Sequence, residues 1–292
     1  MHTVVIDSPA KINIHLEVRE RRNDGFHNII SLFQMISLYD RVEIRAAGDP
    51  GLCKISGRFN FPEADNLIYK AVQSFRSKTG IRTGLRIFVD KRIPEGSGLG
   101  GGSSNAASTL LALNKLFSTE LSTQELADIA ITIGSDIPFF FHLPTAVVGG
   151  RGDKLRPFTS NYTYFCIIIC PLFKVNTGEA YSMIDKDGET TGRGLIEEDI
   201  ENLYRESSPE NWRFFNSFYK PLTNRYPELE QIVLKFRDVG AEYIQMTGSG
   251  SGIYGIFSNK ENAGAACREL KKYYNRIWLT RTLDRKPAAI LK

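Results

Sequence analysis

The stretch Pro94–Asn105, which reads PEGSGLGGGSSN, holds five glycines within the seven positions from Gly96 to Gly102. Such a density is unfavourable inside a helix or strand, because glycine loses more conformational entropy on folding than any other residue. Glycine is useful where the backbone takes positive φ angles or lies close to a ligand. The stretch therefore predicts a functional loop, with a plain flexible linker or tight turn as the alternative.

The flanks of this loop predict a strand before it and a helix after it. Residues 85–90 read LRIFVD, and apolar residues at 106, 107, 110, 113 and 117 follow helical spacing. We expect Ser103 or Ser104 to cap that helix. A glycine loop at a helix N-terminus favours phosphate, because free backbone N–H groups and the positive end of the helix dipole meet there. The loop lacks the Gly-Lys-Ser/Thr ending of a Walker loop.

Residues 8–18 near the start of the chain alternate strictly between apolar and polar, which predicts a strand. The polar face is either exposed to solvent or lines a cleft, and Lys11 and Asn13 lie one pleat apart on it. The apolar face holds Ala10, Ile12, Ile14, Leu16 and Val18, and the polar face holds Lys11, Asn13, His15 and Glu17.

Two further sites stand out from their surroundings, the pair Phe26-His27 and the single residue Asp136. Phe26 and His27 follow the turn at 21–25; together they could stack on and hydrogen-bond a flat ring, or pack as an aromatic beside a surface histidine. Asp136 directly precedes the apolar run Ile137–Phe141. A carboxylate there must be satisfied by backbone donors or by a cation. A plain helix N-cap is the simpler explanation for Asp136.

The composition is that of a globular protein with one large domain or two ordinary ones: 292 residues, 42% hydrophobic and 24% charged. Lys and Arg number 37 against 33 Asp and Glu, evenly spread, which argues against a nucleic-acid partner. We expect no signal peptide, because the amino end lacks a basic region followed by a long apolar stretch, and the longest apolar run, 165–170, is too short to span a membrane. Four cysteines without a CxxC pair favour a reducing compartment, so we expect a cytoplasmic protein.

Strand and helix patterns alternate along the chain, which predicts the α+β class with two domains, residues 1–158 and 159–292. A second glycine cluster, TGSGSG at 247–252, lies between two strand-like segments in the second half. That half has the pattern of a split βαβ unit.

Three motifs in this order resemble the GHMP kinase superfamily, named for galactokinase, homoserine kinase, mevalonate kinase and phosphomevalonate kinase. They are PAKINI at 9–14, the central glycine loop, and MTGSGSG at 246–252. A closer resemblance, to members that act on a methylerythritol linked to cytidine diphosphate, rests on SPAKIN (8–13), DGFH (24–27), GLGGGSSNAA (98–107) and GSDIPFF (134–140). It covers essentially the whole chain, more loosely over 185–240.

The resemblance implies an N-terminal domain like the second domain of ribosomal protein S5 and a ferredoxin-like C-terminal domain. ATP and substrate would meet in the cleft between them. It implies transfer of the ATP γ-phosphate, with Mg²⁺, to the 2-hydroxyl of the methylerythritol. Asp136 would accept the hydroxyl proton, and Lys11 would lower the pKa of the hydroxyl and stabilise developing charge. The alternatives are another small alcohol, such as homoserine or mevalonate, and an inactive relative that binds nucleotide or a protein partner.

The resemblance also assigns the ligand contacts. His27 would contact the edge of the cytosine, and the cytosine would lie between the rings of Phe26 and Tyr181. The family usually has tyrosine at the position of Phe26. No protein carboxylate for Mg²⁺ emerges, so nucleotide phosphates and a loop serine would hold it. We expect no nucleic-acid or membrane partner, and a monomer or weak homodimer. The implied ATP contacts are Pro94, Glu95, Gly96, Ser97, Gly98, Leu99, Gly100, Gly101, Gly102, Ser103, Ser104, Asn66 and Lys91, and the implied substrate contacts are Asn13, Phe26, His27, Thr177 and Tyr181.

Overall fold

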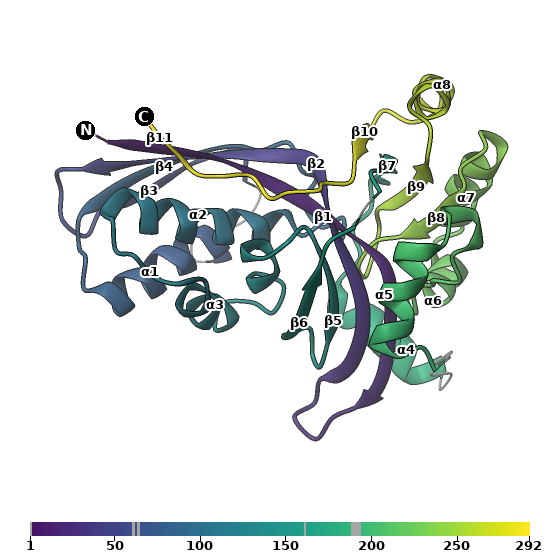
Figure 1. The fold of residues 1–292 in the computed structure, drawn as a ribbon, viewed down its shortest axis with the longest axis horizontal. Helices are drawn as coiled ribbons and strands as arrows, with labels where there is room; N and C mark the ends of the chain where they lie inside the picture. The colour runs from purple at the N-terminus through teal and green to yellow at the C-terminus, as the bar shows by residue number, and fades with distance from the viewer. Residues whose placement is uncertain (1, 60–61, 63–64, 161, 188–193) are drawn as a thin grey trace.

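Two β-sheets with helices packed on them organise the chain, and a long hairpin connects the two (Figure 1). The computed structural model describes residues 2–59, 62, 65–160, 162–187 and 194–292. The α+β class predicted from the alternating pattern is confirmed.

The first sheet has the strand order β11-β1-β2-β4-β3, with β5 paired to β2 and β6 to β5. Helices α1, α2 and α3 cover one of its faces (Figure 1). The bounds are β1 (Thr3–Arg21), β2 (His27–Ala47), β3 (Cys53–Gly57), α1 (Leu67–Thr79), β4 (Gly84–Asp90), α2 (Gly101–Phe117), α3 (Thr123–Ile131), the 3-10 helix η2 (Pro138–Phe141), β5 (Thr145–Gly149), β6 (Lys154–Phe158) and β11 (Ile290–Leu291).

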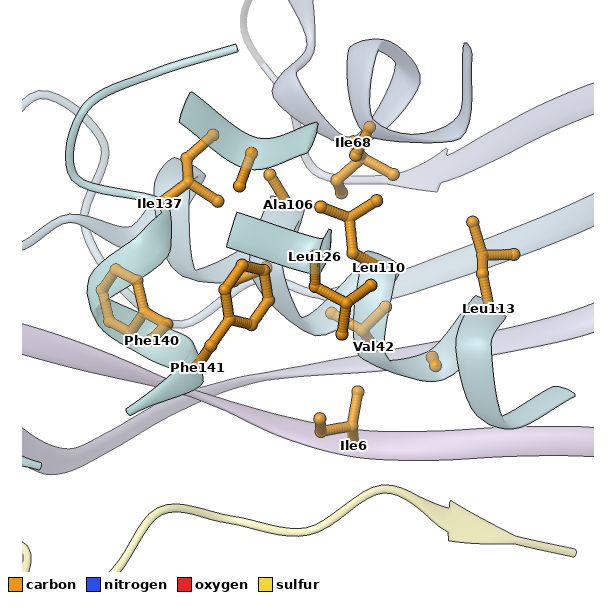
Figure 2. Close-up of a cluster of buried hydrophobic side chains, with 14 of the residues drawn as sticks. Ile6, Val42, Ile68, Ala106, Leu110, Leu113, Leu126, Ile137, Phe140 and Phe141 are labelled. Carbon is orange, nitrogen blue, oxygen red and sulfur yellow. The ribbon is translucent and has the colours of Figure 1, made fainter. Parts of the chain in front are cut away.

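The core of this half lies between the sheet and its helices. Figure 2 shows Ile6 of β1 and Val42 of β2 beneath Leu110 of α2, with Phe141 of η2 beside them. This core holds α2 rigidly, because most of the first half of that helix is buried. The loop that precedes α2 is therefore anchored at its helical end.

The second sheet has the order β10-β7-β9-β8, and all of its pairs are antiparallel. This is the order of a ferredoxin-like split βαβ unit, as the resemblance implies. The bounds are β7 (Phe165–Ile169), α4 (Thr177–Asp187), α5 (Glu197–Glu206), the 3-10 helix η3 (Pro209–Asn211), α6 (Tyr219–Arg225), α7 (Glu228–Asp238), β8 (Tyr243–Met246), β9 (Ile253–Phe257), α8 (Lys260–Leu270) and β10 (Ile277–Arg281).

The β1–β2 hairpin extends from the first sheet toward the second (Figure 1). Ala10, Ile12 and Ile14 share a core with residues of β7 and β9, such as Tyr254. The predicted polar face of this strand is buried as well, so simple solvent exposure is ruled out for it. A strand between two packed bodies has no solvent face, and its polar side chains must find partners inside.

The helix starts test the capping predictions. Asn66 caps α1 by accepting from the N–H of Ile68 at 3.0 Å, and Ser122 forms a capping box on α3. The predicted serine cap of α2 is wrong, because Gly100 is the N-cap, with φ of 67°. Ser103 and Ser104 lie inside the first turn. A left-handed glycine lets the chain enter the helix earlier than a serine cap would.

The change from one sheet to the other falls between β6 and β7, near the predicted boundary of residues 158 and 159. We keep this division as a proposal, because β11 returns from the second half to pair with β1. Among the described residues, no pair of cysteines forms a disulfide. Within the described ranges, no helix combines the length and apolar character that a membrane crossing needs.

Candidate active site

The central loop alternates left-handed glycines with ordinary residues. Gly96, Gly98 and Gly100 have φ angles of 66°, 76° and 67°. A Cβ on Gly98 would lie 2.0 Å from the carbonyl oxygen of Thr247, and one on Gly100 would lie 2.9 Å from Cγ of Lys11. Glycine is therefore required here both by the backbone angle and by close packing, of Gly98 against the C-terminal half and of Gly100 against Lys11 of β1.

The two glycine clusters pack directly on each other, backbone to backbone. The N–H of Gly252 donates to the carbonyl of Ser97 at 3.1 Å, and Oγ1 of Thr247 donates to the carbonyl of Gly98 at 3.1 Å. The 247–252 cluster thus supports the loop from the C-terminal half. The sequence singled out this cluster as a motif but assigned none of its residues to the site.

The glycine loop lines a cleft of about 480 Å³. Ser104 is not among its lining residues; it is buried, and its Oγ lies 2.8 Å from that of Ser8. Every other predicted ATP contact lines this cleft: Asn66, Lys91, Pro94, Glu95, Gly96, Ser97, Gly98, Leu99, Gly100, Gly101, Gly102 and Ser103.

Lys91 lines the cleft, and hydrogen bonds within the protein hold its ammonium group. Its Nζ donates to Oδ2 of Asp40 at 2.6 Å and to the carbonyl of Ile93 at 2.9 Å. The fully buried Asp40 also accepts the N–H groups of Arg92 and Ile93, and the amide of Asn105. A buried carboxylate with four donors is well compensated. Asp40 thus fixes both Lys91 and the chain entering the loop.

A second cleft, of about 900 Å³, is also lined by part of the loop. It shares Gly98, Gly100 and Thr177 with the first cleft. Lys11 and Asp136 line it, together with the predicted substrate contacts Asn13, Phe26, His27, Thr177 and Tyr181. The structure therefore brings all of these residues to one cleft, which adjoins the cleft of the glycine loop.

Lys11 and Asp136 form the charged centre of the larger cleft. Nζ of Lys11 lies 3.4 Å from Oδ2 of Asp136; the lysine side chain is 5% exposed and the aspartate 34%. The ammonium also donates to Oδ1 of Asn13 at 2.7 Å and lies 4.4 Å from the centroid of the Phe33 ring. Lysine is thus held from three sides, while the carboxylate stays open to the cleft.

The plain N-cap reading of Asp136 is wrong. Ile137 occupies the N-cap position of η2. In the part of the chain that the structure describes, no hydrogen bond reaches the Asp136 carboxylate from the backbone. Its partner is the Lys11 ammonium.

Asn13 connects the strand, the lysine and the second glycine cluster. Its Oδ1 accepts from Nζ of Lys11 and from the N–H of Gly248 at 2.9 Å, and its backbone N–H donates to Oγ1 of Thr247 at 3.2 Å. Its Nδ2 donates to Ser31 at 3.0 Å. Most of its hydrogen-bonding capacity is therefore used inside the protein, to position Lys11.

The far end of the larger cleft is aromatic. Phe26 is 56% exposed at the tip of the hairpin, and the Arg151 guanidinium lies 5.6 Å from its ring centroid. The His27 ring stacks on Tyr181, with centroids 5.2 Å apart. Burial, with a contribution from the Asp136 charge, raises the pKa of Tyr181 to about 12. Tyr181 therefore remains a neutral phenol at physiological pH.

Sequence reasoning missed several lining residues of this end, including Arg21, Arg151 and Asp185. A signal existed for Arg151, which lies in the turn-forming sequence GGRGD at 149–153. None existed for Asp185, because it comes from a helix far along the chain and meets His27 only through tertiary packing.

Comparison with known proteins agrees with this architecture. The family model "GHMP kinases N terminal domain" matches residues 66–142, and "GHMP kinases C terminal" matches residues 194–276. A 4-diphosphocytidyl-2-C-methyl-D-erythritol kinase of Thermodesulfovibrio yellowstonii is 38% identical, over 92% of this chain and 94% of its own. One from Alkaliphilus oremlandii is 35% identical, over 97% and 98%.

The solved structures point the same way. A crystal structure of 4-(cytidine 5'-diphospho)-2C-methyl-D-erythritol kinase superposes with a TM-score of 0.81 at 32% identity, covering 95% of this chain and 98% of that one. A homoserine kinase from Cytophaga hutchinsonii, at 16% identity and a TM-score of 0.73 over 100% and 97% of the two chains, shares the fold. The fold and the two domain matches thus define a small-molecule kinase of the GHMP type. Within that class the chain belongs to the family of 4-diphosphocytidyl-2-C-methyl-D-erythritol kinases.

Proposed function

We propose that the chain transfers the γ-phosphate of ATP to the 2-hydroxyl of 4-diphosphocytidyl-2-C-methyl-D-erythritol, which gives the 2-phosphate and ADP in non-mevalonate isoprenoid precursor biosynthesis. The observation that carries this proposal is the Lys11–Asp136 pair, 3.4 Å apart, in a cleft that adjoins the glycine loop. A monomer or weak homodimer remains our prediction for its assembly.

The smaller cleft suits ATP. The glycine loop and the N-terminus of α2 offer backbone N–H groups and a positive dipole end to the phosphates. Asn66 and Lys91 line the same cleft as the loop residues, and the adenine would bind beside them. The γ-phosphate would then lie near Gly98 and Gly100, which the two clefts share.

Mg²⁺ fits this cleft as a companion of the nucleotide. It prefers oxygen ligands and keeps several waters, with few protein ligands beside substrate phosphates. The Ser103 hydroxyl lies in the first turn of α2 and lines the cleft. Over the described residues, no group of three or more His, Cys, Asp or Glu gathers into a metal site. When bound, Mg²⁺ supplies positive charge to the phosphate oxygens.

The chemistry proposed for the protein is one proton transfer and charge stabilisation. Asp136 takes the proton of the 2-hydroxyl as its oxygen forms a bond to the γ-phosphorus and the bond to ADP breaks. The Lys11 ammonium stabilises the developing alkoxide and the transferring phosphoryl group. Asn13 and Phe33 hold that ammonium between the two reactants.

The test is an ADP-release assay with purified protein, ATP and Mg²⁺. The alcohols offered are 4-diphosphocytidyl-methylerythritol, methylerythritol 4-phosphate, mevalonate, homoserine and galactose. We expect turnover of the first alone. Turnover of another of these alcohols would mean that the proposed substrate is wrong and that the Lys11–Asp136 chemistry still holds. No turnover of any alcohol, with ATP still bound, would favour an inactive relative.

The aromatic end of the larger cleft suits the cytidine. Replacing Phe26 by Ala is expected to raise KM for the cytidine substrate about tenfold or more, because base–ring stacking is lost. KM for ATP is expected to stay unchanged, because Phe26 lines only the larger cleft. Steady-state kinetics with each substrate varied in turn measures both values.

The matched control is Phe88→Ala, which removes another half-exposed ring that lines neither cleft. It is expected to leave both KM values unchanged. An equal loss for ATP and the cytidine substrate in Phe26→Ala would show that Phe26 supports the fold rather than the base.

A further inference from the structure

The contact between His27 and Asp185 joins the two halves of the larger cleft. Nε2 of His27, at the start of β2, lies 2.8 Å from Oδ1 of Asp185, in α4. The histidine side chain is 8% exposed, while the aspartate side chain is 37% exposed. The imidazole is therefore bound by the carboxylate in a nearly closed environment.

Ring stacking holds the imidazole in a second direction. The His27 and Tyr181 rings are inclined by 18°, and Tyr181 packs edge-on against Phe218 at 4.9 Å. Nδ1 is then the remaining polar atom of His27. Among the described residues, none makes a hydrogen bond to Nδ1, although His27 lines the larger cleft.

The carboxylate determines which nitrogen of a neutral His27 carries the proton. A carboxylate only accepts hydrogen bonds, so the proton lies on Nε2, and Nδ1 becomes an acceptor. Cytosine carries an exocyclic amino group, a donor, where uracil carries a carbonyl oxygen, an acceptor. An acceptor at Nδ1 pairs with the amino group of cytosine and repels the oxygen of uracil.

We propose that Asp185 is a positioning residue, which fixes the tautomer of His27 and so makes the site select a cytosine-bearing substrate against its uracil counterpart. The inference rests on the proposed function, in which His27 meets the edge of the base. Asp185 acts through His27 and needs no contact with the substrate.

Kinetics with two substrates test the proposal. They are the cytidine substrate and its synthetic analogue in which uracil replaces cytosine, both at about pH 8. Wild type is expected to favour the cytidine by at least about tenfold in kcat/KM, because a site built for a donor rejects an acceptor there. Asp185→Asn is expected to lower that ratio about tenfold, because an amide presents either its oxygen or its NH₂ to Nε2.

Two further variants separate positioning from general damage. Asp185→Glu restores a carboxylate and is expected to recover part of the ratio. Glu179→Gln removes another carboxylate from α4, one that pairs with Arg225 at 3.9 Å, and is expected to keep the wild-type ratio. An unchanged ratio in Asp185→Asn, or an equal loss on both substrates, would overturn the proposal.

Nitrogen-15 NMR of the protein with labelled histidine determines the tautomer of His27 and needs no catalytic turnover. The chain has four histidines, and His27→Gln assigns the signal. Wild type is expected to show a proton on Nε2 alone, and Asp185→Asn a mixture of the two tautomers. A wild-type signal with protons on both nitrogens would contradict the proposal.

Failure of the proposed function can be distinguished from failure of the inference about Asp185. If wild type phosphorylates neither the cytidine nor the uridine compound, the proposed function fails. The NMR result and the binding of CDP against UDP then decide the present inference. Wild type is expected to bind CDP about tenfold more tightly than UDP, and Asp185→Asn is expected to bind the two alike. Equal binding by wild type would overturn it.

Discussion

Replacing Asp136 by Asn is expected to lower kcat by roughly 10²–10⁴-fold, because an amide of the same shape cannot accept the hydroxyl proton. Nucleotide binding is expected to persist, because Asp136 lines only the larger cleft. Lys11 is expected to keep its place, since Asn13 and Phe33 still hold its ammonium. Single-turnover kinetics measures the chemical step, and calorimetric titration with a non-hydrolysable ATP analogue measures binding.

The control for this change is Asp128→Asn in α3. Asp128 is an exposed aspartate that accepts from Gln124 at 2.8 Å and lines neither of the two clefts described above. The kcat of the Asp128→Asn variant is expected to equal that of wild type. Normal turnover in Asp136→Asn would disprove its role as the base and leave Lys11 as the main contributor to catalysis.

Replacing Gly98 by Ala is expected to destabilise the protein by about 2–4 kcal/mol and to weaken ATP binding at least about tenfold. The new Cβ would lie 2.0 Å from the carbonyl oxygen of Thr247, at a φ of 76°. Backbone atoms cannot move aside as a flexible side chain can, so the loop itself must shift. Chemical denaturation and calorimetric titration with an ATP analogue measure the two effects.

Two other glycine-to-alanine changes serve as comparisons. At Gly102, in the same glycine run, a Cβ would meet only Cδ1 of Leu67 at 3.5 Å, so the free energy of unfolding is expected not to fall. At Gly264, in α8, a Cβ would meet only the Arg268 side chain at 3.6 Å, and both stability and turnover are expected to hold. A Gly98→Ala protein with wild-type stability would mean that the stability of the protein does not depend on close packing between the two glycine clusters.

Much of the site could be predicted from local patterns. Strict alternation over 8–18 places Lys11 and Asn13 on one face of a strand, and the structure confirms that both line one cleft. Asn66 and Ser122 form the predicted caps, because a cap depends on a few neighbouring residues. The serine cap of α2 failed, because left-handed Gly100 starts the helix and nothing local distinguishes that start from a serine cap.

Contacts between distant segments could not be predicted in the same way. The His27–Asp185 pair joins residues that are 158 positions apart, and no periodicity links a hairpin tip to a helix in the other half. Arg151 over Phe26 is a similar case. The burial of the polar face of β1 also depends on the second half of the chain, where Gly248 donates its N–H to Oδ1 of Asn13 at 2.9 Å.

The amino-acid sequence by itself determined many of the elements, the glycine-rich loop and the caps of α1 and α3, because these follow from spacing, glycine content and short-range capping. The choice of Lys11 and Asp136 as candidate catalytic residues came from the resemblance to the GHMP kinase superfamily. Only the tertiary structure decided that Lys11 meets Asp136, that the glycine loop packs on Thr247 and Gly252, and that two clefts share Gly98 and Gly100. The physical reason is that a strand or helix forms from local preferences, whereas a catalytic distance depends on how separately formed bodies pack.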